Sequence, residues 1–271
     1  MKGREKMAIS LGDAIKNVRQ DEKWVKKIII CGIIYLIMQI TSSLFSTPLS
    51  NGNSPSIFSF LFLIISVVLG MWFIGFVFSS INKTSNSDKF QMVELSERNL
   101  LLTGLKAFFA MIGWGFLTMF VLLIVGIVYA IIIGIIGAII FGILGALIGF
   151  QNQILTVLIF TFSIAGGAIA GLYFGQLINA AFALYFQRLS FKDFISYKKQ
   201  LQIIMENKHA SWTLVGKSIL YSLTYLAVLF VLLVTIIGII LIPFVIVYAN
   251  FVGYSLVVQY AKEIQIEKYL Q

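Results

Sequence analysis

The sequence contains few charged residues. Asp, Glu, Lys and Arg make up 11% of the 271 residues, whereas a typical soluble domain carries about 25%. The long segment from Leu100 to Gln187 holds one charge, that of Lys106, and 59% of the chain is hydrophobic. This composition excludes a soluble enzyme and a disordered tail. It also excludes a nucleic-acid-binding domain despite the net charge of +9, so no nucleic-acid partner is expected.

Cysteine, histidine and carboxylates are scarce where membrane chemistry would need them. The single cysteine, Cys31, excludes an intrachain disulfide. The single histidine, His209, lies between the apolar runs and is interpreted as a solvated loop residue. All eleven Asp and Glu residues also lie outside those runs. Because proton-coupled pumps and intramembrane hydrolases use such groups at depth, we expect a non-enzymatic protein with no catalytic residue, metal site or cofactor.

Long, continuous apolar runs take the place of these groups. A helix needs about 20 apolar residues to cross a bilayer core of about 30 Å, and a membrane β-barrel would show alternation instead. We therefore predict an all-α fold, a polytopic integral membrane helical bundle with six transmembrane helices, seven and eight being the alternatives. The six spans are predicted at about 28–45, 57–81, 100–125, 156–187, 212–234 and 239–260.

The distribution of basic residues predicts the domain organisation and the orientation. Residues 1–27 are predicted to be an amphipathic N-terminal segment, 28–260 one transmembrane domain and 261–271 a tail. The basic residues number eight in 1–27, three in 82–99, five in 188–211 and two in the tail. Since basic loops face the cytoplasm, both termini and both loops are predicted to be cytoplasmic in a multi-pass protein of the cell membrane.

Two boundaries carry further expectations. The first span is interpreted as an uncleaved anchor, because four acidic residues precede it and no Ala-x-Ala site follows. The run Leu100–Phe150 would be about 77 Å long as one helix, so we expect it to break, with Gly126–Phe150 as a helix extension, a re-entrant hairpin or a broken helix. A turn is expected at Thr235–Gly238, with Pro243 near the start of the last helix.

Two segments outside the spans have the pattern of helices that lie on a membrane. Ser10-x-x-Asp13 and Ser190-x-x-Asp193 resemble capping boxes, and apolar residues follow each at helical spacing. On Ser190–Lys208 the apolar face is predicted to comprise Phe191, Phe194, Ile195, Leu201 and Met205. We expect cytoplasmic interfacial helices that contact the phospholipid bilayer and its anionic headgroups. The alternative is a helix packed on its own bundle.

Six polar residues inside the spans are candidate binding residues. Lys106 and Lys217 either snorkel to the cytoplasmic end or hold an anionic headgroup or solute. The uncharged candidates are Gln39, Gln176, Asn179 and Asn250. These four side chains either form hydrogen bonds between helices or line a polar pathway.

Small residues recur at four-residue spacing in the middle of the chain. Gly167, Gly171 and Gly175 form one such row, and a second runs from Gly126 to Ala146. Rows of this kind let helix backbones approach closely. The first interpretation is packing of the two rows on each other within the chain; homo-oligomerisation and a glycine-lined pore are the alternatives.

Several segments resemble one known family. They are Asp-Glu-Lys-Trp-Val-Lys-Lys-Ile-Ile-Ile-Cys-Gly at Asp21–Gly32, Gly104-Leu-Lys106, Phe191–Asn207, and Pro243–Gln259 with its Gly253. These segments are similar to a bacterial and archaeal family of multi-pass membrane proteins known only as a domain of unknown function. The resemblance implies six spans and assigns no catalytic residue.

Two functions fit these observations. The first is a non-enzymatic membrane protein that acts through its bundle and basic cytoplasmic face on lipids or on a partner membrane protein. The second is a transporter or channel for a small or amphipathic solute, which would use Gln39, Gln176, Asn179 and Asn250 along a narrow path. A cavity that reaches those residues would favour the second function.

Overall fold

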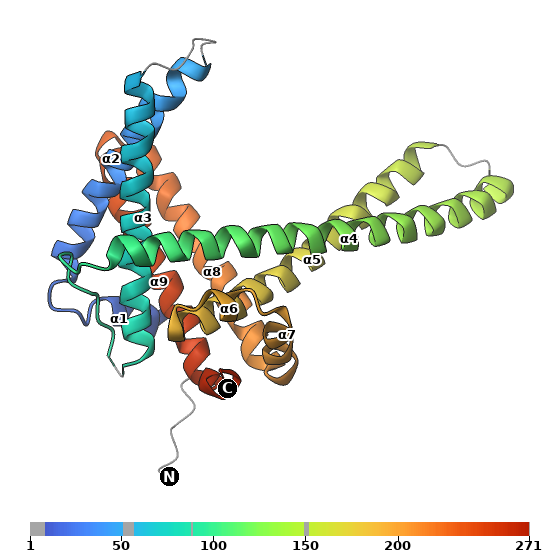
Figure 1. The fold of residues 1–271 in the computed structure, drawn as a ribbon. Helices are drawn as coiled ribbons and strands as arrows, with labels where there is room; N and C mark the ends of the chain where they lie inside the picture. Colours follow the sequence, from blue (N-terminus) through green and yellow to red (C-terminus); the bar gives the residue numbers. More distant parts are fainter. Residues whose placement is uncertain (1–8, 51–56, 88, 149–151, 271) are drawn as a thin grey trace.

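A computed structural model describes residues 9–50, 57–87, 89–148 and 152–270. The described residues form helices joined by loops (Figure 1). The helices are α1 (Leu11–Val18), α2 (Trp24–Ser50), α3 (Ile57–Ser85), α4 (Leu100–Ile148), α5 (Asn152–Arg188), α6 (Phe191–Phe194), α7 (Tyr197–Glu206), α8 (Lys208–Leu233), α9 (Ile236–Glu263) and the 3₁₀ helix η1 (Ile266–Tyr269).

Six of these helices are long and apolar enough to cross a bilayer. The segments that meet this condition are Trp24–Ser46, Ile57–Ser85, Leu100–Tyr129, Ile164–Arg188, Lys208–Leu233 and Ile237–Glu263. The predicted all-α, polytopic bundle with six spans is thereby confirmed. The reason is that each span is an apolar run long enough to satisfy its own backbone hydrogen bonds within lipid.

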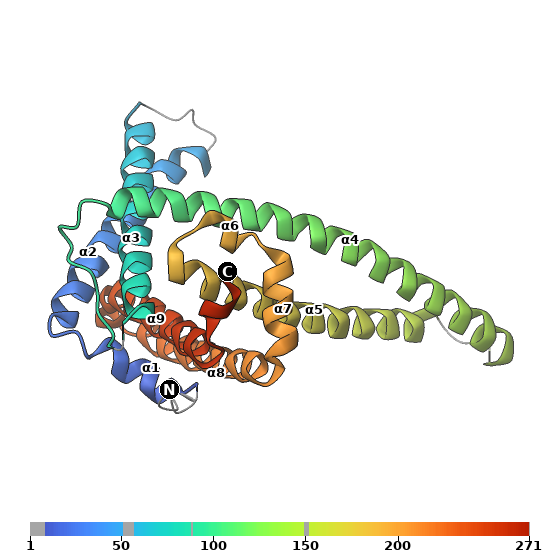
Figure 2. The ribbon, with the colours of Figure 1, turned by 60° about the horizontal axis from the view of Figure 1, so that its bottom comes forward.

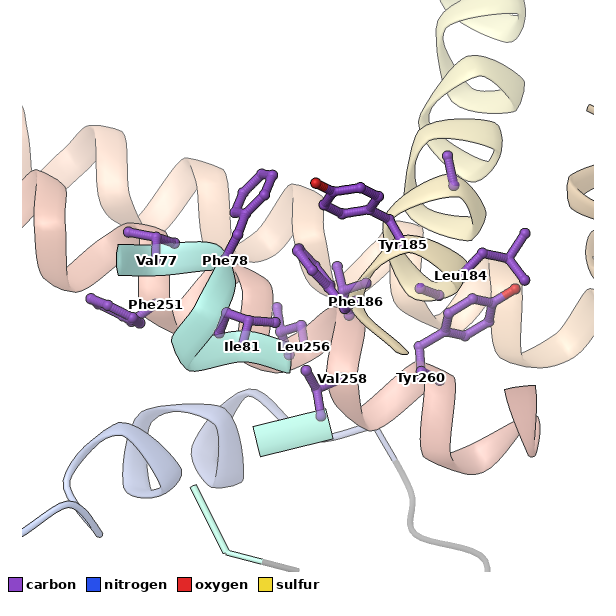
Figure 3. Packing of buried hydrophobic residues seen from close by; sticks show 14 of the residues in the cluster. Val77, Phe78, Ile81, Leu184, Tyr185, Phe186, Phe251, Leu256, Val258 and Tyr260 are labelled. Carbon is purple, nitrogen blue, oxygen red and sulfur yellow. The ribbon is translucent and has the colours of Figure 1, made fainter. Parts of the chain in front are cut away.

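The best-packed core lies where the ends of α3, α5 and α9 meet (Figure 3). The ring of Phe78 on α3 makes edge contacts with Tyr185 and Phe186 of α5 and with Tyr254 of α9, at centroid distances of 5.3–5.7 Å. Such aromatic pairs stabilise a structure beyond the area that they bury. This core fixes the relative position of α5 and α9.

Helix α4 lies crosswise to α3 and continues far beyond the bundle, where the first part of α5 accompanies it (Figures 1 and 2). The expectation that Leu100–Phe150 must break is wrong for Leu100–Ile148, which is one continuous helix. No proline interrupts this segment, and each backbone N–H after the first turn finds its acceptor within the helix, so no local feature forces a break. Of the three alternatives for the Gly-rich segment, the described residues show a helix extension; residues 149–151 lie outside them.

The turn before the last helix confirms one expectation and corrects another. Helix α8 ends at Leu233, and Thr235 caps α9 by accepting a hydrogen bond from the Gly238 N–H at 2.9 Å. Pro243, however, lies inside α9 rather than in its first turn. Membrane helices tolerate an internal proline because neighbouring groups can satisfy the carbonyl that it leaves free.

The segment after α5 also differs from its prediction as one amphipathic helix. It forms two short helices, α6 and α7, separated near Ser196. Phe194, expected among lipid chains, is buried against the rings of Tyr185 and Phe182 at 5.2 and 5.3 Å. The aromatic cluster of α5 therefore competes successfully with lipid for this side chain.

Candidate functional site

A cleft of about 420 Å³ lies between α5, α8 and α9. Its α8 residues lie near the middle of Lys208–Leu233, and its α9 residues lie in the central part of Ile237–Glu263. The cleft therefore lies midway along two of the candidate membrane spans. It is lined by Asn179, Phe182, Ser218, Tyr221, Ser222, Tyr225, Ile246, Ala249, Asn250, Gly253, Tyr254, Leu256 and Val257.

Helix α8 presents two free hydroxyl groups to the cleft. Thr213 and Thr224, on the same helix, donate hydrogen bonds to carbonyls one turn earlier, at 2.9 Å each. Back-bonding of this kind is how hydroxyl side chains are usually satisfied in a helix. Ser218 and Ser222, one turn apart, form no hydrogen bond within the described residues. Their hydroxyls are available to whatever fills the cleft.

The two asparagines add further hydrogen-bonding capacity. Asn250 uses its Nδ2 on the Ile246 carbonyl at 3.0 Å, which leaves its Oδ1 as a free acceptor. Asn179, on α5, makes no hydrogen bond to any described residue. A free carboxamide offers both donors and acceptors, so this side chain can bind either kind of polar group.

Tyrosines complete the polar surface. The hydroxyl of Tyr221 donates to the Ala249 carbonyl at 2.8 Å and so joins α8 to α9 in the wall of the cleft. The Tyr221 and Tyr225 rings stack one turn apart, with centroids 6.4 Å apart. The hydroxyls of Tyr225 and Tyr254 have no hydrogen-bond partner among the described residues. The cleft thus combines an aromatic wall with several uncommitted polar groups, all of them on uncharged residues.

The structure brings two of the predicted binding residues together and separates the other amides from them. Asn179 and Asn250 both line the cleft. Gln176 lies one turn before Asn179 but is buried outside the cleft, and its Nε2 has no partner within the described chain. Gln39 lies exposed on α2 and takes no part in this site. Only Asn179 and Asn250 therefore fit the polar-pathway interpretation.

The two intramembrane lysines are placed differently. Lys106 is exposed on α4, near its crossing with α3, and has no ion-pair partner among the described residues. Lys217 is half-buried on α8 and directly precedes Ser218, although it does not itself line the cleft. Snorkelling and anion binding by these lysines stay predictions.

Sequence reasoning missed the polar residues of α8. Ser218, Tyr221, Ser222 and Tyr225 recur at three- and four-residue spacing within an otherwise apolar run. That spacing places them on one helix face and was a signal available from the sequence. Because these residues are Ser and Tyr, the amide and charged side chains alone do not reveal this face.

The predicted glycine packing is absent from the described part of the chain. A Cβ added to Gly167, Gly171 or Gly175 would meet no atom within 4 Å. Helices α4 and α5 therefore do not meet at these three glycines in the described structure. They touch instead at Gly166, where the Tyr129 ring occupies the space of a side chain. Oligomerisation and a pore at this row stay predictions.

The basic segments lie together at one end of the bundle. Lys27 Nζ donates to the Met92 carbonyl at 2.8 Å, which joins the N-terminal segment to the 82–99 loop. Lys262 Nζ donates to the Ser87 carbonyl at 2.6 Å. Arg188 donates to the Leu270 carbonyl at 2.9 Å. These contacts bring the N-terminal segment, the 82–99 loop, the end of α5 and the tail close together. The orientation of this end relative to the membrane stays a prediction.

One acidic residue organises this end. Burial of Asp21 disfavours its charge, but hydrogen bonds from Lys27 Nζ at 3.1 Å and from the Met92 and Lys23 N–H groups at 2.9 Å outweigh that effect. The pKa of Asp21 is therefore lowered. Ionised Asp21 binds the loop before α4 to the start of α2.

No protein-family model matches this chain, and no curated protein or solved structure shows significant similarity to it. The family resemblance of its sequence segments stays a prediction.

Proposed function

We propose that this multi-pass membrane protein binds a small uncharged solute in the α5–α8–α9 cleft and carries it across the membrane. The observation on which this proposal depends is the set of uncommitted polar groups at mid-depth: the side chains of Asn179, Ser218, Ser222, Tyr225 and Tyr254. It is the second of the two functions that the sequence suggests, and the cleft favours it over the first.

The hydrocarbon of the membrane makes unpaired polar groups unfavourable. An unsatisfied polar group in hydrocarbon costs several kcal/mol. Polar groups within a span therefore form hydrogen bonds within the protein or line a water-filled cavity. Several such groups that converge on one cleft require water or a polar ligand there. A cleft of about 420 Å³ falls within the range of small-molecule sites.

The residues that line the cleft also indicate that the ligand is uncharged. None of the residues that line the cleft is charged, and a buried charge without a counter-charge is strongly unfavourable. The solute that fits is therefore uncharged and carries both hydrogen-bonding groups and an apolar face for the Tyr221–Tyr225 wall. We further propose a non-enzymatic role in the cell membrane with the basic end in the cytoplasm, as the positive-inside rule favours.

The test is solute flux into liposomes that contain the purified full-length chain. Glycerol, urea and erythritol serve as uncharged probes, and entry is followed by light scattering after an osmotic jump. We expect at least one probe to enter faster than into protein-free liposomes. Asn179→Leu and Asn250→Leu should each slow that entry by about tenfold, the effect of losing one or two hydrogen bonds.

Gln39→Leu is the matched control, because it removes an amide from a span without touching the cleft. Its flux should equal that of the wild type. Entry no faster than into protein-free liposomes for every probe would contradict the proposal, as would an equal loss in all three variants.

A further inference from the structure

Helices α6 and α7 differ from the other short helices in what they expose. Helix α1 buries Ala14 and Val18, and η1 buries Ile266 and Tyr269. In contrast, Phe191, Leu201 and Met205 of α6 and α7 are 48%, 49% and 66% exposed. Because α6 and α7 do not span the membrane, lipid tails around the spans do not by themselves explain this exposure. Something apolar must cover these three side chains.

The same surface carries cations without partners. Lys192 on α6, Lys198 on α7 and Lys208 at the first position of α8 are exposed and form no ion pair with any described residue. The acidic neighbours are already engaged: Asp193 is buried and lies 3.9 Å from Lys199 Nζ, and Glu206 accepts a hydrogen bond from Tyr269 and lies 3.8 Å from Lys268 Nζ. The surface therefore has an uncompensated positive charge beside its apolar side chains.

The inner faces of α6 and α7 fix which way this surface points. Phe194 and Ile203 are almost fully buried, and Gln200 is fully buried with its Nε2 donating to the Phe194 carbonyl at 2.6 Å. The two helices connect the end of α5 to the start of α8, both of which are membrane spans. They therefore lie at one end of both of these candidate spans, and their inner face packs against Trp114 of α4.

We infer that the outer surface of α6–α7 docks onto the anionic headgroups of the surrounding bilayer. Leu201 and Met205 enter the acyl region, and Lys192, Lys198 and Lys208 lie at the level of the lipid phosphates. Exposed apolar side chains flanked by lysines are what an interfacial, anionic-lipid-binding element requires. This inference is independent of the proposed solute flux.

The test uses the full-length chain in nanodiscs. An environment-sensitive fluorophore is attached to Met205→Cys in a Cys31→Ala background, since Cys31 is the only native cysteine. Nanodiscs contain either phosphatidylcholine alone or phosphatidylcholine with phosphatidylglycerol. We expect a blue shift of the emission in the anionic nanodiscs, reversed by high salt because the Debye length shortens.

Two triple variants test whether the lysines of this surface, rather than the net charge of the protein, cause the blue shift. Lys192→Gln/Lys198→Gln/Lys208→Gln should lose the blue shift. Lys16→Gln/Lys26→Gln/Lys89→Gln removes the same charge from other exposed sites and should keep it. Both should retain the wild-type melting temperature in neutral nanodiscs.

Three results would overturn the inference. The first is identical emission in the two lipid compositions with the label in water. The second is an equal loss of the blue shift in both triple variants. The third is a salt-insensitive blue shift in both compositions, which would indicate that protein, such as a second copy of the chain, covers Met205.

Discussion

Gly75 of α3 and Gly104 of α4 lie face to face at the crossing of their helices. A Cβ on Gly75 would overlap the carbonyl oxygen of Leu100, and a Cβ on Gly104 would overlap the carbonyl oxygen of Met71. The obstacles are backbone atoms on both sides, which no rotamer change can move. This contact sets how closely α4 crosses α3 and hence the direction of the long α4–α5 arm.

Gly104→Ala should destabilise the protein. The added methyl group must separate two helix backbones, and overpacking of this kind costs about 1–3 kcal/mol. Thermal unfolding in detergent should show a lower melting temperature. Gly115→Ala, on the same helix, is the control, since a Cβ there meets no described atom within 4 Å. Its melting temperature should be unchanged or higher, because Ala favours a helix over Gly by about 0.5–1 kcal/mol.

Gly171→Leu should leave the stability of the single chain unchanged. The position has no neighbour within 4 Å in the described structure, so a larger side chain points into lipid. Melting temperature measured on the monomeric species should match the wild type. A lower melting temperature would show that the Gly167–Gly175 face is covered, by a second copy or another helix.

Asp21→Asn should weaken the protein in a pH-dependent way. The lowered folded-state pKa of Asp21 means that its stabilising contribution is present above the ordinary pKa of about 3.9 and is lost as pH falls through the folded value. The Lys27 side chain, whose Nζ lies 3.1 Å from Asp21, is 4% exposed. Removal of one partner of a buried pair costs up to about 3–5 kcal/mol. The difference in unfolding free energy between wild type and variant should be greatest near neutral pH.

The same comparison with Glu94→Gln provides the control. Glu94 pairs with Lys23 at 3.5 Å and lies 3.8 Å from Lys27 Nζ, but its own side chain is 62% exposed. Because solvent screens an exposed carboxylate, the change should cost less than about 1 kcal/mol. The difference in unfolding free energy between Asp21→Asn and the wild type should therefore shrink at low pH. An equal difference at pH 7 and below pH 3 would show that ionisation of Asp21 does not stabilise this end.

Cysteine labelling of intact cells should reveal the orientation. In the Cys31→Ala background, an impermeant maleimide should modify Ser50→Cys but not Glu97→Cys or Ser196→Cys. The latter two positions lie in the basic loops, which the positive-inside rule places in the cytoplasm. Labelling of Ser196→Cys from outside would reverse the assignment.

The spans were predictable because the bilayer imposes length and hydrophobicity on each helix, and Thr235 signalled the last turn by its capping chemistry. Asn179 and Asn250 were also recognisable, since an amide within an apolar run is unfavourable unless it is hydrogen-bonded. Their meeting in one cleft depends on how α5 crosses α9, which no local pattern records.

The helix crossings were not predictable. The row Gly167–Gly175 has the expected spacing yet contacts no described atom, whereas Gly75 and Gly104 are single glycines in different helices. Close packing depends on which faces meet, not on spacing alone. Phe194 illustrates the same limit, because its burial follows from tertiary aromatic contacts on α5.

The most direct test of the central claim, that a polar cleft within the membrane admits water and a polar solute, is the accessibility of Ser222. In the Cys31→Ala background, Ser222→Cys lines the cleft, whereas Leu223→Cys is 61% exposed on the same helix outside the residues that line it. A charged, water-soluble methanethiosulfonate reagent reacts with thiolate, which requires water. We expect Ser222→Cys in liposomes to react at least about tenfold faster than Leu223→Cys, because only the cleft should hold water. Equal rates at the two positions, or no reaction at Ser222→Cys, would contradict the account.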